Sequence, residues 1–516
     1  MNNNAPDPCL PPVHHRQDVA FLPVEGTASF QLTYPWRDAA WMQSRGLHQA
    51  PRSPIAIYEV HPTSWMRVPE EANRFLTYRE LAPKLADYVQ RHGFTHVQLS
   101  SPLPPNSAPG STAAFSWPDA RQGAQEFMLL IDLLHQEGIG IILRWSPSPF
   151  PSPSEENDAA PQSVDYTRPD VRRIHLSNAI TWLRHFHIDG LFVDLDEMGQ
   201  FSAGNSAENS GVIEFLQQFN EVINRELPDV QTWAKLSTDE SRVLLPVSLG
   251  GFGFGFKWDS AWKRDTLSYL SLDPIHRKHH HELLTRREPE AGKNERYVLA
   301  LSEEYGRAPS ILTQIPGDEW QRFATLRLLL AYQWVLPGKK LLFMGTEFGQ
   351  WSGWDPDKSL DWHLVEPRNI HNGVQKLIGH LNWLYRHEPA LHRGEDSPHS
   401  FEWVDKSNAQ HSTLAFLRKS DSGQGDLILA LFNFTPVPRH NARFGVPRSG
   451  YWREVLNTDS GDYGGSGQGN LGGLESSPFG WQSRPHSIHV TLPPLAAVYF
   501  RQTASDPGPT KTGAEA

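Results

Sequence analysis

The segment from residue 187 to residue 196 reads HIDGLFVDLD and contains a carboxylate, Asp194, that could be catalytic. An apolar run over residues 191–193 follows the pair Asp189-Gly190, which favours a turn, and leads directly into Asp194. The pattern predicts a short buried strand with a carboxylate at its C-terminal tip. In β/α barrels, catalytic side chains lie at this end of the strands. Asp194 is therefore the first candidate for a catalytic group.

The pattern His-Ile-Asp-Gly-Leu-x-Val-Asp resembles the nucleophile segment of glycogen (1,4-α-glucan) branching enzymes, in the α-amylase clan of glycoside hydrolases. The resemblance covers residues 30–501 and is densest over residues 254–387, for example in PGKKLLFMGTEFGQW. It implies a (β/α)8 TIM barrel followed by a C-terminal antiparallel β-sandwich. It also implies retaining transfer between α-glucan chains. In that reaction one carboxylate attacks the anomeric carbon and a second carboxyl, about 5 Å away, protonates the leaving oxygen.

The resemblance places the nucleophile at Asp194, but two residues that should support it are changed. Phe192 stands where the family has an arginine beside the nucleophile. The acid/base glutamate of the family lies in the text AEESTD, whereas residues 234–239 read AKLSTD here, so that Lys235 takes the acid/base position. An ammonium group there should pair with Asp194 rather than protonate a glycosidic oxygen. Loss of a positioned acid removes about 100- to 10,000-fold of rate enhancement.

Other carboxyl groups are available only outside the matching positions. After the seventh predicted strand the family reads LSHDE, whereas residues 301–305 read LSEEY, so the histidine is lost. Glu304 is a candidate stand-in for the third carboxylate, although it is one methylene longer than aspartate. The nearest substitutes for the acid are Asp239 and Glu240, which lie several residues beyond the strand end.

The third predicted strand also ends in changed residues. Arg144 replaces an aspartate of the family and Pro149 replaces a histidine. The tyrosine that stacks on the sugar in the family has no counterpart between residues 102 and 117. These losses favour a branching-enzyme-like protein of glycogen metabolism with a degraded active site. Such a divergent, inactive pseudoenzyme would bind glucan or regulate an active glycogen enzyme.

Two alternatives remain open. The first is an active 1,4-α-glucan branching enzyme, a retaining α-1,4 to α-1,6 glucanotransferase, or an α-glucan hydrolase. There Asp194 would attack, Asp239 or Glu240 would be the acid, and Glu304 would assist. The second alternative is a structural subunit that does not bind glucan. The expected ligands are glycogen and maltooligosaccharides, and no cofactor or metal is expected.

Eight apolar runs alternate with helical segments, which is typical of a parallel β/α barrel. Thr77 and Glu80 form a T-x-x-E capping box before a helical apolar stripe, and a helix over residues 125–137 should stop at Gly138. The strands are predicted at residues 55–60, 96–99, 139–145, 191–194, 230–236, near 250–256, 297–302 and 340–345.

Differences in composition and hydrophobic pattern divide the chain into four predicted regions. Residues 1–50 are predicted to be a leader and linker, and the N-terminal glucan-binding module of the family is expected to be absent or vestigial there. Residues 51–392 form the predicted barrel. Residues 393–502, with short β-rich runs and Gly/Ser-rich turns, form the predicted β-sandwich. Residues 503–516 are a tail whose composition predicts disorder.

The composition limits the binding partners and the cellular compartment that are expected for the protein. A net charge of −11 provides no basic surface for nucleic acid or anionic membranes, and the single cysteine, Cys9, suits the cytoplasm. The HRKHHH run at residues 276–281 is interpreted as a solvated helix end rather than a metal site. Trp351, Trp354 and Trp362 could stack on glucan, but packing in the scaffold is the preferred interpretation.

Overall fold

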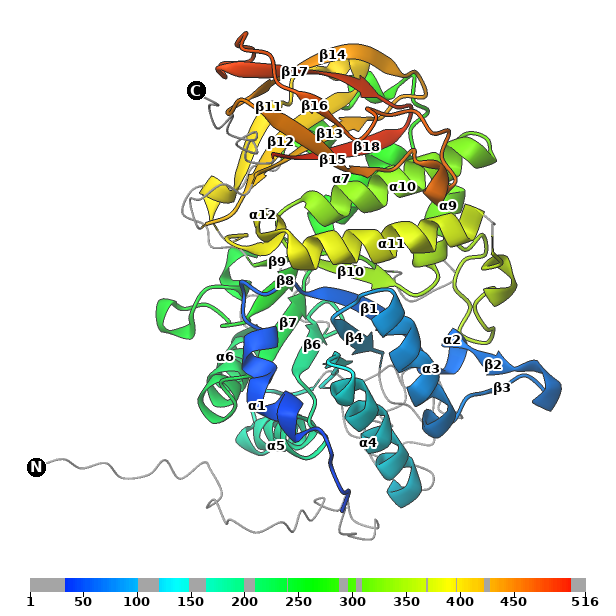
Figure 1. The fold of residues 1–516 in the computed structure, drawn as a ribbon. Helices are drawn as coiled ribbons and strands as arrows, with labels where there is room; N and C mark the ends of the chain where they lie inside the picture. The colour runs from blue at the N-terminus through cyan, green and yellow to red at the C-terminus, as the bar shows by residue number, and fades with distance from the viewer. Residues whose placement is uncertain are drawn as a thin grey trace, which may run out of the picture.

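The computed structural model describes residues 33–100, 120–147, 164–198, 209–238, 240–286, 296–302, 309–367, 370–395, 397–421 and 427–502. Its first part closes into a barrel of parallel strands in the order β1-β10-β9-β8-β7-β6-β5-β4, with helices outside them (Figure 1). The strands are β1 (Ala56–Val60), β4 (His96–Leu99), β5 (Gly140–Arg144), β6 (Gly190–Asp194), β7 (Gln231–Lys235), β8 (Phe256–Trp258), β9 (Tyr297–Leu301) and β10 (Lys339–Phe343). The predicted barrel is confirmed.

The helices follow the predicted signals closely. At the start of α3, the Thr77 hydroxyl accepts the Glu80 backbone N–H at 3.3 Å, and the Glu80 carboxylate accepts the Thr77 N–H at 2.9 Å. Helix α4 ends before Gly138, which has a φ of +72°. It begins five residues before the predicted start, because its first turn is polar and carries no apolar stripe. The helices outside the strands include α1 (Ala39–His48), α2 (Pro62–Trp65), α3 (Tyr78–Arg91), α4 (Ala120–Gln136), α5 (Pro169–His185), α6 (Asn209–Glu226), α7 (Ser260–Leu270), α8 (Glu282–Thr285), α9 (Ile311–Gln314), α10 (Glu319–Val335), α11 (Ile370–His387) and α12 (Pro389–His392).

Alternate residues of the strands fill the barrel interior with apolar side chains. The rings of Phe192 and Trp258 stack with their centroids 4.5 Å apart, and those of Trp233 and Phe256 stack at 4.2 Å. Because side chains alternate along a strand, the next inward position lies two residues further on. At that level three neighbouring strands carry charges: Arg144 on β5, Asp194 on β6 and Lys235 on β7.

The C-terminal part is an antiparallel β domain, as predicted. A six-stranded sheet has the order β11-β12-β13-β18-β15-β16, and β14 pairs with β17 in a two-stranded sheet. Figure 1 shows these strands above α10 and α11. The strands are β11 (Phe401–Asp405), β12 (Thr413–Lys419), β13 (Leu427–Asn433), β14 (Arg439–Val446), β15 (Tyr451–Asn457), β16 (Gly473–Glu475), β17 (His486–Leu492) and β18 (Ala496–Gln502), and a short hairpin of β2 (Arg67–Val68) and β3 (Arg74–Phe75) belongs to the barrel part.

Buried arginines join the barrel to the C-terminal domain. Each guanidinium donates to a backbone carbonyl on the other side: Arg277 to Phe434, Arg327 to Thr458, and Arg418 to Val335. A single apolar cluster continues across the same boundary. Arg277 is completely buried, so the HRKHHH segment is not the wholly solvated helix end that was predicted. The prediction was wrong because the sequence does not reveal that this segment faces the second domain.

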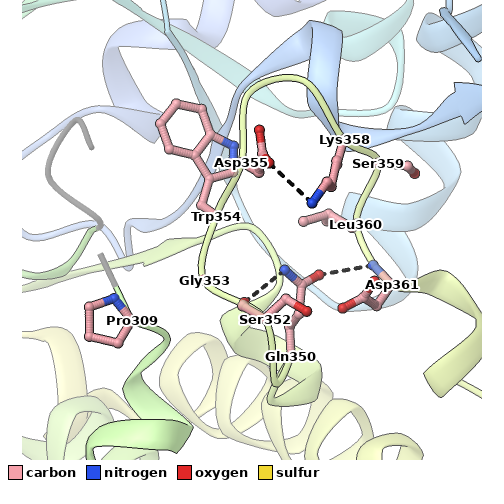
Figure 2. A pocket seen from close by; sticks show the side chains of 10 residues that line it. All are labelled: Pro309, Gln350, Ser352, Gly353, Trp354, Asp355, Lys358, Ser359, Leu360 and Asp361. Carbon is pink, nitrogen blue, oxygen red and sulfur yellow. Dashed lines mark hydrogen bonds and ion pairs between the residues drawn. The ribbon is translucent and has the colours of Figure 1, made fainter. Parts of the chain in front are cut away.

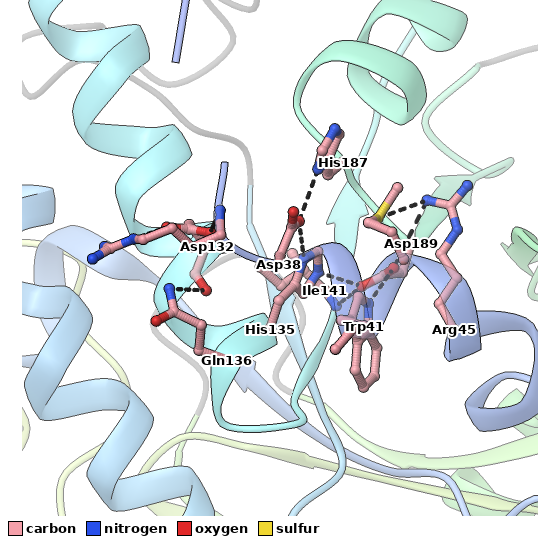
Figure 3. Close-up of polar contacts among 12 residues, drawn as sticks. Asp38, Trp41, Arg45, Asp132, His135, Gln136, Ile141, His187 and Asp189 are labelled. Atoms are coloured by element: carbon pink, nitrogen blue, oxygen red, sulfur yellow. Dashed lines mark hydrogen bonds and ion pairs between the residues drawn. The ribbon is translucent and has the colours of Figure 1, made fainter. Parts of the chain in front are cut away.

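At the N-terminal end of the barrel strands, a buried ionic network fixes α1 to the barrel (Figure 3). His135 of α4 contacts Asp38 through Nδ1 and Asp189 through Nε2, both at 2.9 Å. Asp189 also accepts the Trp41 indole N–H at 2.9 Å and the Ile141 backbone N–H at 2.7 Å. The predicted turn at Asp189-Gly190 is therefore wrong: Asp189 is a buried acceptor and the glycine is the first residue of β6.

The charge on His135 predicts a pH-dependent stability. Burial alone would lower the pKa of His135, but the carboxylates of Asp189 and Asp38 outweigh burial and raise it from 6.5 to about 9. Because the folded pKa exceeds the unfolded one, this stabilisation is complete below pH 6.5 and is lost as the pH rises through 9. We expect the free energy of unfolding to fall by about 3 kcal/mol between these pH values. Urea unfolding at both pH values would measure the change, and equal free energies would mean that the imidazole is neutral in the fold.

Candidate active site at the barrel mouth

Asp194 lies at the C-terminal end of β6 with its side chain only 4% exposed. Its Oδ2 accepts hydrogen bonds from Arg144 Nη2 at 3.1 Å and from Lys235 Nζ at 3.2 Å. Its Oδ1 accepts the backbone N–H of Asp196 at 3.2 Å. The pairing with Lys235 that the sequence led us to expect is therefore present. Two cations therefore share one oxygen of the carboxylate, Oδ2.

Strand register explains how the two cations reach Asp194. Lys235 is the direct neighbour of Asp194 across the β6–β7 pair, and Arg144 is the neighbour of Phe192 across the β5–β6 pair. Phe192 itself points into the barrel, and the Arg144 guanidinium lies 5.5 Å from its ring centroid. The guanidinium that the family would place on this strand is thus supplied from the adjacent strand. Sequence reasoning treated Arg144 only as a lost aspartate.

Two acidic residues just beyond β6 complete the cluster and were missed in the sequence. Glu197 Oε1 accepts Arg144 Nη2 at 2.7 Å, and Asp196 Oδ2 lies 3.8 Å from Lys235 Nζ. Because Asp194 and Glu197 contact the same nitrogen, at 3.1 and 2.7 Å, their oxygens are at most about 6 Å apart, near the separation of a retaining carboxyl pair. The signal was available as consecutive acids after a strand end.

A further carboxyl lies deeper in the barrel mouth. Glu59 of β1 is buried and accepts the Gln98 amide N–H at 3.1 Å. Burial raises the pKa of Glu59, while hydrogen bonding by Ser302 and the charge of Arg144 act against that rise. The side chain therefore favours the protonated form more than a surface glutamate does. Glu59 was not predicted from the sequence.

The substitute acids named from the sequence receive no support from the described residues. Both oxygens of Glu240 accept hydrogen bonds from Arg242, at 3.0 and 2.8 Å. This pairing lowers the pKa of Glu240, whereas a general acid must hold its proton. Asp239 and Glu304 lie outside the described residues, as does Cys9.

A cleft of about 510 Å³ opens at this end of the barrel. Trp258 lines it, and charged side chains of both signs surround the opening: Arg144, Lys235 and Lys263 against Asp194, Asp196 and Glu197. In the described part of the chain no group of three His, Cys, Asp or Glu side chains is arranged to hold a metal ion. None of the described helices combines the length and apolar character needed to cross a membrane.

A second cavity, of about 310 Å³, lies along residues 350–361 (Figure 2). Trp354 lines it but is only 7% exposed, and its indole N–H is donated to Ser64 at 3.0 Å. The indole of Trp362 donates to the Trp65 carbonyl at 2.7 Å, and Trp351 packs edge-on against Phe323. The three tryptophans thus pack within the scaffold, as the preferred interpretation held.

Comparison with known proteins gives consistent matches. Residues 403–503 match the family model described as alpha amylase, C-terminal all-beta domain. The chain is 46% identical over 520 residues to 1,4-alpha-glucan branching enzyme GlgB of Aquifex aeolicus, covering 93% of this chain and 81% of the relative. Identity to the GlgB of Albidiferax ferrireducens is 42%, covering 93% and 82%.

Solved structures agree on the fold. A putative alpha amylase from Salmonella typhimurium superposes with a TM-score of 0.62 at 15% identity, covering 91% of this chain and 84% of that one. An Anoxybacillus alpha-amylase superposes with a TM-score of 0.62 at 14% identity, covering 89% and 100%. At such low identity these likenesses concern the architecture alone.

Proposed function

Because the chain belongs to the family of 1,4-alpha-glucan branching enzymes GlgB, in the alpha-amylase clan, we propose that it is a member that binds α-glucan without branching it. The observation that carries the proposal is the pairing of Asp194 with two cations, one of them at the acid/base position. The setting we propose is cytoplasmic glycogen metabolism, with glycogen or maltooligosaccharides as ligands.

The chemistry of the site supports this proposal in two ways. A retaining reaction needs a carboxylate free to attack and a carboxyl that delivers a proton to the leaving oxygen. Lys235 Nζ lies 3.2 Å from the attacking group instead and directs its proton to Asp194. The Lys235 ammonium adds a second charge-assisted hydrogen bond to the oxygen that Arg144 already binds, which holds this carboxylate more tightly than an arginine alone would. The cleft of about 510 Å³ at the barrel mouth, lined by charged and polar side chains, meanwhile offers hydrogen-bonding groups for the hydroxyls of a sugar chain.

A second candidate is an active branching enzyme, favoured by the similarity to GlgB proteins and by the position of Glu197. The Glu197 carboxyl lies at most about 6 Å from that of Asp194, close to the separation that a retaining mechanism uses. Asp194 would attack the anomeric carbon, and Glu197 would protonate the leaving glucan oxygen. Arg144 would have to release Glu197, because the acid must carry a proton.

We expect purified full-length protein to show no branching of amylose, and Asp194→Asn to be equally silent. Iodine colour and the short chains released by a debranching enzyme would measure branching. An active relative such as the Aquifex enzyme serves as the positive control, and far-UV circular dichroism verifies folding. The same variants would be run in glycogen-containing native gels, where retarded migration reports glucan binding.

Each result has one meaning. Branching that falls at least about 100-fold in both Asp194→Asn and Glu197→Gln would establish the active alternative and contradict the proposal. Absence of branching with retarded migration would support the proposal. Unretarded migration of folded protein would favour the third interpretation, a structural subunit that does not bind glucan.

A further inference from the structure

Two aromatic side chains project from the C-terminal domain between β16 and β17. Phe479 is 70% exposed and Trp481 is 46% exposed, although both types are normally buried. We call this pair the aromatic platform. The two residues are separated by one glycine in the sequence, and Arg443 contacts both, through the Phe479 carbonyl and the Trp481 ring.

Arg443 of β14 holds the aromatic platform in place. Its Nη2 donates to the Phe479 carbonyl at 3.1 Å, and its Nε donates to the Ser487 hydroxyl at 3.0 Å. Its guanidinium also lies 4.8 Å from the ring centroid of Trp481, within the range of a cation–π contact. Arg443 therefore covers one face of the indole and leaves the exposed remainder to a ligand.

The turn that carries Trp481 is held in one conformation. Trp481 and Arg484 exchange backbone hydrogen bonds of 3.0 Å, and the two residues between them, Gln482 and Ser483, have φ values of +49° and +61°. Non-glycine residues adopt this left-handed conformation uncommonly. The side chain of Gln482 accepts the Gly445 N–H at 3.0 Å, and a Cβ on Gly445 would lie 2.1 Å from the Trp481 carbonyl. The platform is thus built on a pre-organised backbone, which lowers the entropic cost of binding.

We infer that the aromatic platform is a surface site for an α-glucan chain, an inference that rests on the glucan binding proposed above. A pyranose ring offers an apolar C–H face to an aromatic ring and hydroxyls to polar groups at its edge. Within the described residues the indole N–H of Trp481 has no hydrogen-bond partner, so it can donate to a sugar hydroxyl. The exposed His489 lies directly opposite Arg443 on the neighbouring strand and adds a second polar group.

The size of the platform favours a narrow ligand over a protein partner. Its apolar part consists of two rings, and its neighbours Ser483, Arg443 and His489 are polar. A stable protein interface needs roughly 800 Å² on each partner, with a larger apolar centre. A glucan chain needs only a short series of ring contacts.

Affinity electrophoresis of the full-length protein in glycogen-containing native gels tests the inference. We expect Trp481→Ala to raise the dissociation constant for glycogen on the order of 10-fold, and Phe479→Ala to raise it less. Trp481→Phe, which keeps an aromatic ring, should retain most of the affinity. The matched control is Trp383→Ala, which removes a 51% exposed tryptophan from α11 and should bind like the wild type. Unchanged melting temperatures would show that each variant is folded.

The wild type and the variants report on separate questions. Wild-type protein that is not retarded by glycogen would overturn the proposed glucan binding and, with it, the premise of the platform. Retarded wild type with equally retarded Trp481→Ala would overturn the platform alone. An equal loss of affinity in Trp383→Ala would also overturn it, because the loss would then follow from removing any exposed tryptophan.

Discussion

Replacing His135 by leucine should lower the free energy of unfolding at pH 7 by about 3–5 kcal/mol. The imidazole lies between Asp38 and Asp189 at 2.9 Å from each, and all three side chains are at most 2% exposed. Leucine would leave two buried carboxylates facing each other without the cation between them. Asp189 would keep its bonds from Trp41 and the Ile141 N–H, which is why the loss should not be larger. Urea unfolding followed by circular dichroism would measure it.

Two comparisons make this prediction specific. His280→Leu removes an exposed histidine and should change the free energy of unfolding by no more than about 0.5 kcal/mol. The deficit of His135→Leu should also shrink as the pH rises through 9, because the wild type itself loses the charge on His135 in this range. A deficit of the same size at pH 6.5 and pH 9 would mean that lost packing, rather than lost charge, destabilises the variant.

Replacing Arg144 by leucine should lower the free energy of unfolding by about 3 kcal/mol. Its guanidinium, 10% exposed, is hydrogen-bonded to both Asp194 and Glu197. Without it, Lys235 alone would neutralise Asp194, and Glu197 would lose its partner. Asp194→Asn should cost about 1–2 kcal/mol less in the Arg144→Leu background than in the wild type, because the bond between Arg144 and Asp194 can be lost only once. A double-mutant cycle by urea unfolding would measure this coupling.

Arg264→Leu is the matched control for that cycle. Arg264 lines the same cleft, but its side chain is 64% exposed, so we expect a change within about 0.5 kcal/mol. Additive effects of Arg144→Leu and Asp194→Asn would contradict the prediction. They would mean that the two side chains touch without stabilising each other, and the case for a neutralised nucleophile would weaken accordingly.

The barrel could be predicted from sequence because short-range signals specify it. Apolar runs such as residues 191–193 end at polar residues, and the capping box at Thr77 marks the start of α3. Lys235 could be paired with Asp194 because the resemblance assigned both to the same site. That step needed only the positions of two residues on consecutive strands.

The features that the sequence did not reveal depend on contacts between residues of different strands and helices. Arg144 reaches Asp194 because β5 and β6 align Arg144 with Phe192, a register that no local pattern states. Asp189 reads as a turn residue, yet α4 brings His135 against it from 54 residues away. Trp481 looked no different from the buried tryptophans, because its exposure depends on where Arg443 and the turn hold it. In each case a side chain's role is set by tertiary contacts.

The boundary between the barrel and the C-terminal sheet has one more consequence, for cooperativity. The apolar cluster that includes Leu329 of α10 also includes Phe432 and Tyr499 of the sheet, so the two parts share a core in addition to the separate cluster inside the β domain. Arg327 and Arg418 would lose carbonyl partners if the parts separated. Unfolding of either part would expose this shared cluster, so we expect the two parts to unfold together rather than as independent modules. A destabilising substitution on the sheet, far from the cleft, would then also lower the stability of the barrel.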